Sequence, residues 1–144
     1  PPMTVLARRE DGLEVDDDPA RFDLDVTYDL VVNQAYWATE RTRDFVAQTI
    51  AASWSFGVYD GDRQLGFARV VTDRLTFAWV CDVVVDEPLR GRGIGHFLMQ
   101  TVTEAVSSTI VGWQVLRTRD AHSLYRDLGW TDLVEADRWM EIRP

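Results

Sequence analysis

The sequence holds few of the residues that build disulfides and metal centres. Its 144 residues include one cysteine, Cys81, and two histidines. A single cysteine cannot form a disulfide within the chain, and its position in an apolar run favours a small buried thiol. These three residues show no spacing typical of a metal site. We therefore predict no metal ion, and we expect the reducing environment of the cytoplasm.

Basic residues and long apolar runs are also scarce. Lysine and arginine together number 15 against 24 aspartates and glutamates, which gives a formal net charge of −9. Nucleic-acid binding depends on clustered basic residues, so this balance disfavours a nucleic-acid partner. No run approaches the roughly 20 apolar residues of a membrane span, so we expect no membrane partner. The acidic residues between positions 10 and 25 are predicted to form a solvated surface.

The length and the 46% hydrophobic content predict one domain over residues 1–144, large enough to bury a core. The sequence shows neither an internal repeat nor a low-complexity linker. We interpret Met3 as the natural start, with Pro1 and Pro2 as residues left over from cloning.

Hydrophobic periodicity predicts a mixed α/β fold. Apolar residues spaced by three and four predict helices at 24–34, 41–52, 93–107 and 121–128. Strand-like runs occupy 54–59, 64–72, 76–85 and 113–118.

The order of these segments indicates how they connect. Asp60-Gly61 suits a tight hairpin turn, so the first three strands should form an antiparallel meander. The third strand, the helix at 93–107 and the strand at 113–118 then form a right-handed βαβ unit with parallel strands. After Gly129, a helix cap, we expect segments 130–134 and 138–142 to close the chain as a hairpin.

A glycine-rich turn links the strand at 76–85 to the following helix, in the run Arg90-Gly91-Arg92-Gly93-Ile94-Gly95. Glycines let backbone N–H groups approach a ligand, and the helix N-terminus adds partial positive charge, so this junction suits a pyrophosphate. The alternative is a tight connection that needs glycine only for its backbone angles. A P-loop is excluded because His96 and Phe97 follow Gly95, and the dinucleotide fingerprint fails because Leu98 replaces its third glycine.

Two motifs resemble the GNAT superfamily of N-acetyltransferases: Arg90-x-x-Gly93-x-Gly95, and Ala121-x-x-x-Tyr125-x-x-x-Gly129-Trp130. The resemblance covers about residues 22–143 and implies a mixed sheet that splays between its two parallel central strands, flanked by helices. Further segments, among them Gly66-Phe67-Ala68-Arg69, resemble a poorly characterised bacterial subgroup, which brings no known substrate. Thr118 departs from the superfamily, which often has asparagine there.

The resemblance implies acetyl-CoA as the cofactor and direct transfer of its acetyl group to an amine. It implies that the backbone of Val83, Val84 and Val85 pairs with the pantetheine arm. It also implies that the pyrophosphate lies on the N–H groups of Arg90, Gly91, Arg92, Gly93, Ile94 and Gly95. A backbone N–H near Val83 would stabilise the oxyanion. Tyr125, which matches a tyrosine close to the CoA sulfur, would bind the cofactor and act as the general acid.

Two residues are candidates for the general base. Asp82 lies inside an apolar strand, where a carboxylate needs a partner or a task. Its alternative is an ion pair with Arg69 or Arg119. His122 shares a helix face with Tyr125 and titrates in a useful range, although a purely structural hydrogen bond is its alternative.

The acceptor is the least constrained part of the prediction. Trp37 and Arg69 are our candidates for binding it, and the acidity of the chain favours a cationic small-molecule amine. Two alternatives stay open: an acyl-CoA-binding module without turnover, and an acetyltransferase acting on protein N-termini or lysines. A homodimer is a further expectation, because homodimers are common in the resembling superfamily.

Overall fold

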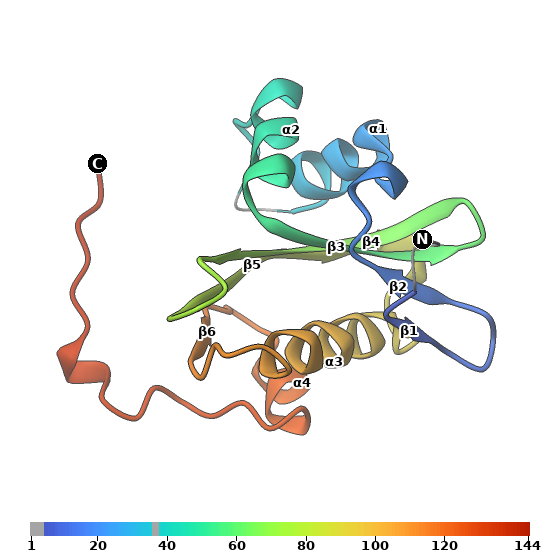
Figure 1. The fold of residues 1–144 in the computed structure, drawn as a ribbon. Helices are drawn as coiled ribbons and strands as arrows, with labels where there is room; N and C mark the ends of the chain where they lie inside the picture. The colour runs from blue at the N-terminus through green and yellow to red at the C-terminus, as the bar shows by residue number, and fades with distance from the viewer. Residues whose placement is uncertain (1–4, 36–37) are drawn as a thin grey trace.

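A computed structural model describes residues 5–35 and 38–144. A six-stranded sheet in the order β1-β2-β3-β4-β5-β6 forms the middle layer. Helices α1 and α2 cover one face of the sheet, and helices α3 and α4 cover the other (Figure 1). Each face has its own apolar core, so the sheet is buried on both sides.

The predicted meander is confirmed. Strands β3 (Trp54–Asp60), β4 (Arg63–Thr72) and β5 (Ala78–Val85) pair in antiparallel fashion. Gly61 turns the β3–β4 hairpin with a φ of +57°, which glycine adopts without steric cost. Strand β3 is buried on both faces from its first residue to Tyr59, because helices lie above and below it.

The early helices also form where the sequence predicts them. Helix α1 (Leu24–Tyr28) is capped by the Asp23 carboxylate and continues as the π-helical turn η2 (Asp29–Asn33). Helix α2 (Arg43–Ala52) is capped by the hydroxyl of Thr42. Both cap side chains accept backbone N–H groups of the first turn, and such a cap stabilises a helix by about 1 kcal/mol.

The βαβ unit places β6 beside β5. Helix α3 (Ile94–Ser107) crosses the sheet and leads to β6 (Gln114–Leu116), which pairs in parallel with the first three residues of β5. Beyond Val80 the two strands have no common register, which confirms the predicted splay. Helix α4 (His122–Asp127) follows, and Gly129 ends it with a φ of +94°.

The structure contains one hairpin of the sheet that the sequence did not predict. Strands β1 (Ala7–Arg8) and β2 (Glu14–Asp16) form a hairpin that pairs with β3. The acidic region that contains β2 was expected to be a solvated surface, and this is wrong for Asp16, which is buried. Arg21 forms ion pairs with Asp16 and Glu14, and these contacts balance the buried charge.

The predicted terminal hairpin at 130–134 and 138–142 is also wrong. After β6, the described residues contain no strand, and η4 (Ala136–Arg138) is a single 3₁₀ turn. Residues 131–144 are all exposed and leave the body of the protein as an extended segment (Figure 1). An isolated two-stranded hairpin is marginal in water, so strand-like spacing does not form a strand where no sheet edge pairs with it.

Close packing at the centre of the sheet can be tested at Gly66. Gly66 lies between β3 and β5, where an added Cβ would come within 2.9 Å of the Val84 carbonyl oxygen. We expect Gly66→Ala to lower the free energy of unfolding by about 2 kcal/mol, as overpacking does. Gly112→Ala is the control, because a Cβ there meets nothing within 4 Å. Urea denaturation of both variants measures this, and equal stabilities would contradict the packing.

Candidate acyl-CoA site

The site begins where β5 separates from β6. Residues 81–85 of β5 lie beyond the last β6 pair, so in the described part of the chain no strand pairs with this side of their backbone. Free backbone N–H and C=O groups at such a position bind an extended ligand in the manner of an added strand. Val83, Val84 and Val85, the residues predicted to pair with the pantetheine arm, all lie on this segment.

A β-bulge lies at the start of the segment. Arg69 pairs with Cys81 and Phe67 with Val84, so three steps on β5 oppose two on β4. Asp82 has a φ of +52°, a left-handed conformation that aspartate tolerates better than most residues. The extra residue of a bulge drops out of the hydrogen-bonded ladder. The bulge therefore lies next to Val83, whose neighbouring backbone N–H is the predicted oxyanion donor.

The glycine-rich turn that follows β5 forms the second part of the site. Gly91 and Gly93 have φ values of +82° and +75°, so both need glycine for their backbone angles. Gly93 is the N-cap of α3 and makes no side-chain cap hydrogen bond. The first-turn N–H groups of a helix lack internal acceptors, and α3 offers them together with its positive dipole end. The turn suits a diphosphate.

Three arginines lie near this glycine-rich turn. The guanidinium of Arg90 donates to the Val85 carbonyl at 3.0 Å, so it holds the end of β5 as well as lying beside the turn. Arg92 is exposed. Arg9, which the sequence analysis did not select, donates to the Arg92 carbonyl at 3.3 Å and lies over the ring of Phe97. The β1–β2 hairpin thus brings a third positive charge to the α3 N-terminus.

Asp82 forms a buried ion-pair cluster with two arginines. Its Oδ2 atom accepts from Arg41 at 2.7 Å and from Arg69 at 2.9 Å, and its side chain is 4% exposed. Burial by itself would raise the pKa of Asp82, but the hydrogen bond from Arg41 and the charge of Arg69 outweigh it and hold the pKa below its usual value. The predicted pairing with Arg69 is confirmed, and Arg41 is an additional partner.

The two candidate acceptor-binding residues differ in what the structure describes. Arg69 is buried, and it donates to Ser53 at 3.0 Å as well as to Asp82. Its guanidinium therefore has protein partners already, and it contributes to the shape of the site more than to an open contact surface. Trp37 lies outside the described residues.

Tyr125 and His122 come from α4 on the other face of the sheet. Tyr125 is 8% exposed and packs edge-on against Trp130, with ring centres 6.0 Å apart. Burial raises the pKa of Tyr125 to about 12, so its hydroxyl keeps its proton at neutral pH. Among the described residues no partner hydrogen-bonds this hydroxyl. His122 is exposed one turn earlier, and Thr118 caps this region by accepting the Ala121 N–H at 2.9 Å.

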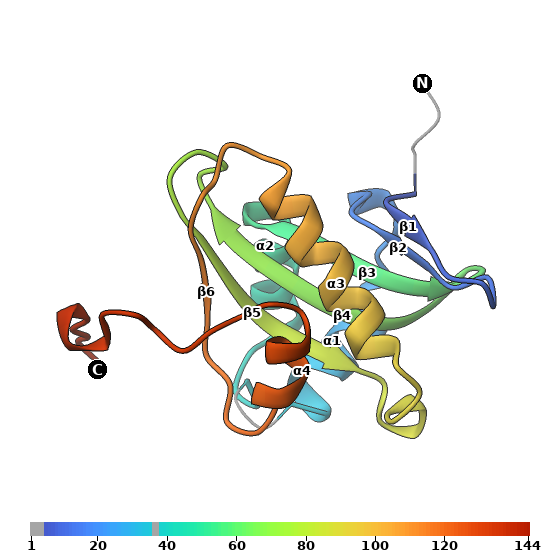
Figure 2. The same ribbon diagram turned by 90° about the horizontal axis from the view of Figure 1, so that it is seen from below.

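Tyr125 and His122 also line an open groove beside β6, which we call the edge groove. Figure 2 shows β6 at the edge of the sheet, next to β5. It runs between β6, α4 and the exposed terminal segment. In the described part of the chain, no three histidine, cysteine or carboxylate side chains are grouped to hold a metal ion. None of the described helices is long and apolar enough to cross a membrane.

The unpaired end of β5 and the N-terminus of α3 suit an extended ligand with a diphosphate, and comparison with known proteins gives the family. A family model for the acetyltransferase (GNAT) domain matches residues 52–132. A crystal structure of a Xanthomonas campestris protein described as belonging to the GNAT family is 30% identical, covers 96% of each chain and superposes with a TM-score of 0.85. The chain belongs to the GNAT family of acetyltransferases.

Two further proteins are similar to this chain. The Gibberella zeae protein FG08082, named provisionally as an acetyltransferase, is 26% identical over 148 aligned positions, which cover 85% of this chain and 81% of the relative. A Staphylococcus aureus structure is 21% identical, covers 92% and 99% of the two chains and has a TM-score of 0.71, which shows the same fold.

The buried ion-pair cluster predicts a pH-dependent stability. Removing one partner of such a cluster leaves uncompensated charge, so we expect Asp82→Asn to lower the free energy of unfolding at neutral pH by about 3 kcal/mol. Because the folded-state pKa is depressed, the stabilisation is complete above the unfolded-state pKa of about 3.9 and disappears as the pH falls through the folded-state value.

Denaturant titrations of wild type and Asp82→Asn from neutral to acidic pH measure this. The stability difference should stay constant to about pH 4 and shrink below it. Asp25→Asn is the matched control, because Asp25 pairs with Arg43 on the surface, where an ion pair contributes less than about 1 kcal/mol. A difference between wild type and Asp82→Asn that does not change with pH would contradict the cluster.

Proposed function

We propose that this protein transfers the acetyl group of acetyl-CoA to the amine of a small molecule. The observation that carries the proposal is the unpaired end of β5, which runs directly into the uncapped N-terminus of α3 through Gly91 and Gly93. A thioester on an extended arm with a diphosphate behind it has the chemistry that these two features accept. We further propose that the reaction takes place in the cytoplasm, without nucleic acid or membrane as a partner.

The residues present fit coenzyme A. The space around the two left-handed glycines is open. An added Cβ at Gly91 would meet no atom within 4 Å, and one at Gly93 would meet only Arg9, at 3.6 Å. A phosphate can therefore approach the backbone. The N–H groups of residues 90–95 would hold the diphosphate, and residues 83–85 would hold the arm. Bound acetyl-CoA supplies an activated acetyl group on a thiolate leaving group.

The chain's own groups assist the transfer at both ends. When an amine displaces the thiol of bound acetyl-CoA, the backbone N–H near Val83 would stabilise the charge on the acetyl oxygen. Tyr125 would give its proton to the departing sulfur as the carbon–sulfur bond breaks. Its pKa of about 12 keeps it protonated at neutral pH, and burial beside Trp130 fixes its ring.

The proton lost by the amine has two candidate acceptors in this chain. Asp82 is ionised but already accepts from two arginines, so it is a weak base, and its proposed contribution is to position Arg41 and Arg69. His122 is exposed beside Tyr125 and can pass a proton to water. The properties of Cys81 also favour direct transfer over an acetylated-enzyme intermediate. Burial raises the pKa of the Cys81 thiol to about 11, which disfavours the thiolate that such an intermediate would need.

Cofactor binding is tested by calorimetric titration with acetyl-CoA. We expect Gly93→Asp to weaken binding by about tenfold or more, because a carboxylate at the α3 N-terminus repels a diphosphate. The control is Gly61→Asp, which makes the same change at another left-handed glycine, in the β3–β4 turn. Equal affinity of all three proteins, or no binding by wild type, would refute the cofactor site.

Turnover is tested by thiol release with a panel of diamines, aromatic amines, amino sugars and peptides with free N-termini. With the best acceptor, we expect Tyr125→Phe to lower kcat by about 100-fold and to leave the affinity for CoA unchanged, because the ring stays and only the proton donor is lost.

The wild-type rate should rise with pH as the amine deprotonates. It should show no decrease from Tyr125 below about pH 11.

The outcomes separate the alternative functions. Binding of acetyl-CoA without release of the CoA thiol in the presence of any amine would indicate an acyl-CoA-binding module. Release only with peptides would indicate a protein acetyltransferase. A Tyr125→Phe variant with full kcat would remove Tyr125 from the mechanism while leaving the cofactor site intact.

A further inference from the structure

The ion-pair cluster around Asp82 carries an excess of positive charge. Arg41 and Arg69 both pair with the Asp82 carboxylate, and in the described part of the chain no other carboxylate pairs with either arginine. Two positive charges and one negative charge leave a net charge of +1, although the whole chain carries −9. Charge held away from water is unfavourable unless a counter-charge compensates it, so the cluster favours a bound anion.

Arg41 is the member of the cluster that a small molecule can reach. Its side chain is 24% exposed, against 11% for Arg69. Its Nη1 atom donates to Asp82, whereas its Nε and Nη2 atoms donate to none of the described residues. The N–H groups on Nε and Nη2 of a guanidinium are parallel, and two parallel donors bind both oxygens of a carboxylate.

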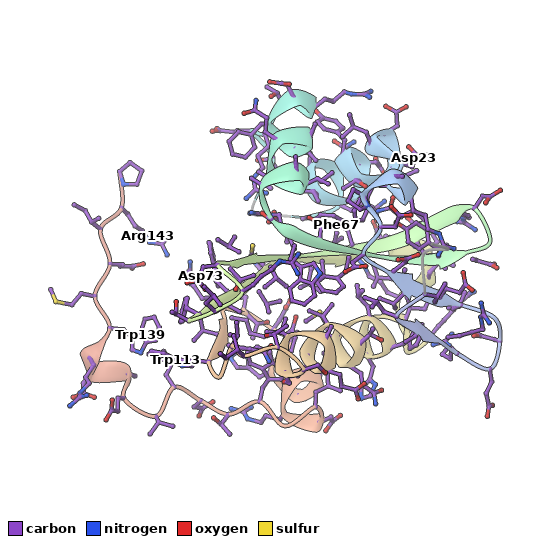
Figure 3. All side chains as sticks on the ribbon, viewed as in Figure 1. Asp23, Phe67, Asp73, Trp113, Trp139 and Arg143 are labelled. Carbon is purple, nitrogen blue, oxygen red and sulfur yellow. The ribbon has the colours of Figure 1, made fainter. Side chains whose placement is uncertain are left out.

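The cluster lies on the face of the sheet that α1 and α2 partly cover. Ala68 and Val70 of β4 point into the core that contains α3, so Arg69 between them points to the opposite face. Phe67 points to that same face and packs in the apolar core that η2 and α2 cover (Figure 3). Arg41 directly precedes the cap of α2, so both arginines approach the carboxylate of the cluster from this side.

Exposed apolar side chains continue this surface beyond the arginines. Val71 lies two residues after Arg69 on β4 and pairs with Trp79 of β5, so the three side chains point to one face. Val71 is 40% exposed and Trp79 is 39% exposed. The half-exposed ring of Phe45, from α2, has its centre 5.6 Å from the Arg41 guanidinium. A molecule whose anionic group lies on Arg41 would therefore rest an apolar part on this surface.

The cluster also adjoins the position assigned to the acetyl group. Asp82 directly precedes Val83 at the bulge, and consecutive Cα atoms are about 3.8 Å apart. An anion on Arg41, the partner of Asp82, is therefore within the length of one small molecule of the oxyanion donor near Val83. An amine elsewhere on that molecule can then reach the acetyl carbon.

We propose that the acceptor is an amine that also carries a carboxylate on an apolar body, and that Arg41 binds this carboxylate. The inference rests on the proposed acetyl transfer and names the class of its acceptor. One negative charge matches the net charge of the cluster, whereas the two charges of a phosphate exceed it. The products are the N-acetylated carboxylate and the CoA thiol, so one proton passes from the amine to the sulfur and nothing else is consumed.

Thiol release with amines that differ only in the carboxylate tests the acceptor class. Phenylalanine is compared with phenethylamine, and 4-aminobutanoate is compared with propylamine. The compound 3-aminopropylphosphonate serves as the doubly charged analogue. In the better of the two pairs, we expect wild-type kcat/KM to be about 30-fold higher for the carboxylate compound, as a charge-assisted bidentate contact gives. Equal rates within both pairs, or a preference for the phosphonate, would overturn the proposal.

Variants at Arg41 test the residue. Arg41→Met should raise the KM of the carboxylate compound by about 30-fold and leave the KM of its matching amine and the affinity for acetyl-CoA unchanged. Arg41→Lys keeps the charge without the parallel donors, so its KM should lie between the two. Arg43→Met is the matched control, because Arg43 pairs with Asp25 on the surface, and it should keep the wild-type preference. Equal losses for both members of a pair would show that Arg41 only supports the fold, which contradicts its proposed role.

A binding measurement that needs no turnover separates this proposal from the proposed function. With and without CoA, 3-phenylpropanoate should raise the unfolding midpoint of wild type and not that of Arg41→Met, and the uncharged 3-phenylpropanamide should raise neither. A wild type without this shift under either condition would refute the carboxylate site even if acetyl transfer takes place. A shift without thiol release from acetyl-CoA would refute acetyl transfer and support the carboxylate site.

Discussion

The short register between β5 and β6 is the constraint on which the rest of the site depends. Parallel strands joined by α3 pair over only three residues, and the sheet then opens. If the pairing continued to Val85, the backbone that we assign to an extended ligand would be occupied by β6. The α3 N-terminus would still be present, but no strand end would lead a ligand to it.

Asp82 helps to hold the opening in place. The bulge at this residue shifts the register of β5 against β4, and bulges increase the local twist of a strand, just beyond the point where pairing with β6 ends. A left-handed aspartate in a buried strand is unfavourable by itself, and two arginines from different elements compensate its charge. Arg41 precedes α2 and Arg69 lies on β4, so the cluster ties the helical layer to the bulge.

Much of this architecture follows from local sequence patterns, because helices with strong three- and four-residue spacing and a hairpin with Asp60-Gly61 are decided within short windows. The glycine turn is equally local. The β1–β2 hairpin escaped prediction because Leu13 and Val15 are surrounded by acidic residues, and their alternation is visible only over three positions. The contact of Arg9 with the Arg92 carbonyl and that of Arg41 with Asp82 could not be predicted, because they join residues 83 and 41 positions apart.

The exposed terminal segment illustrates a different limit. Segment 138–142 was predicted as a strand from its alternation, and the error concerns the partner more than the propensity. The backbone groups of a helix hydrogen-bond within the helix, but those of a strand need a second strand beside it. An alternating pattern in the sequence therefore indicates a strand without showing which strand pairs with it. Here Trp139 packs against Trp113 and Phe77, and no strand of the described residues lies beside the segment, so its backbone stays without the hydrogen bonds that a strand requires.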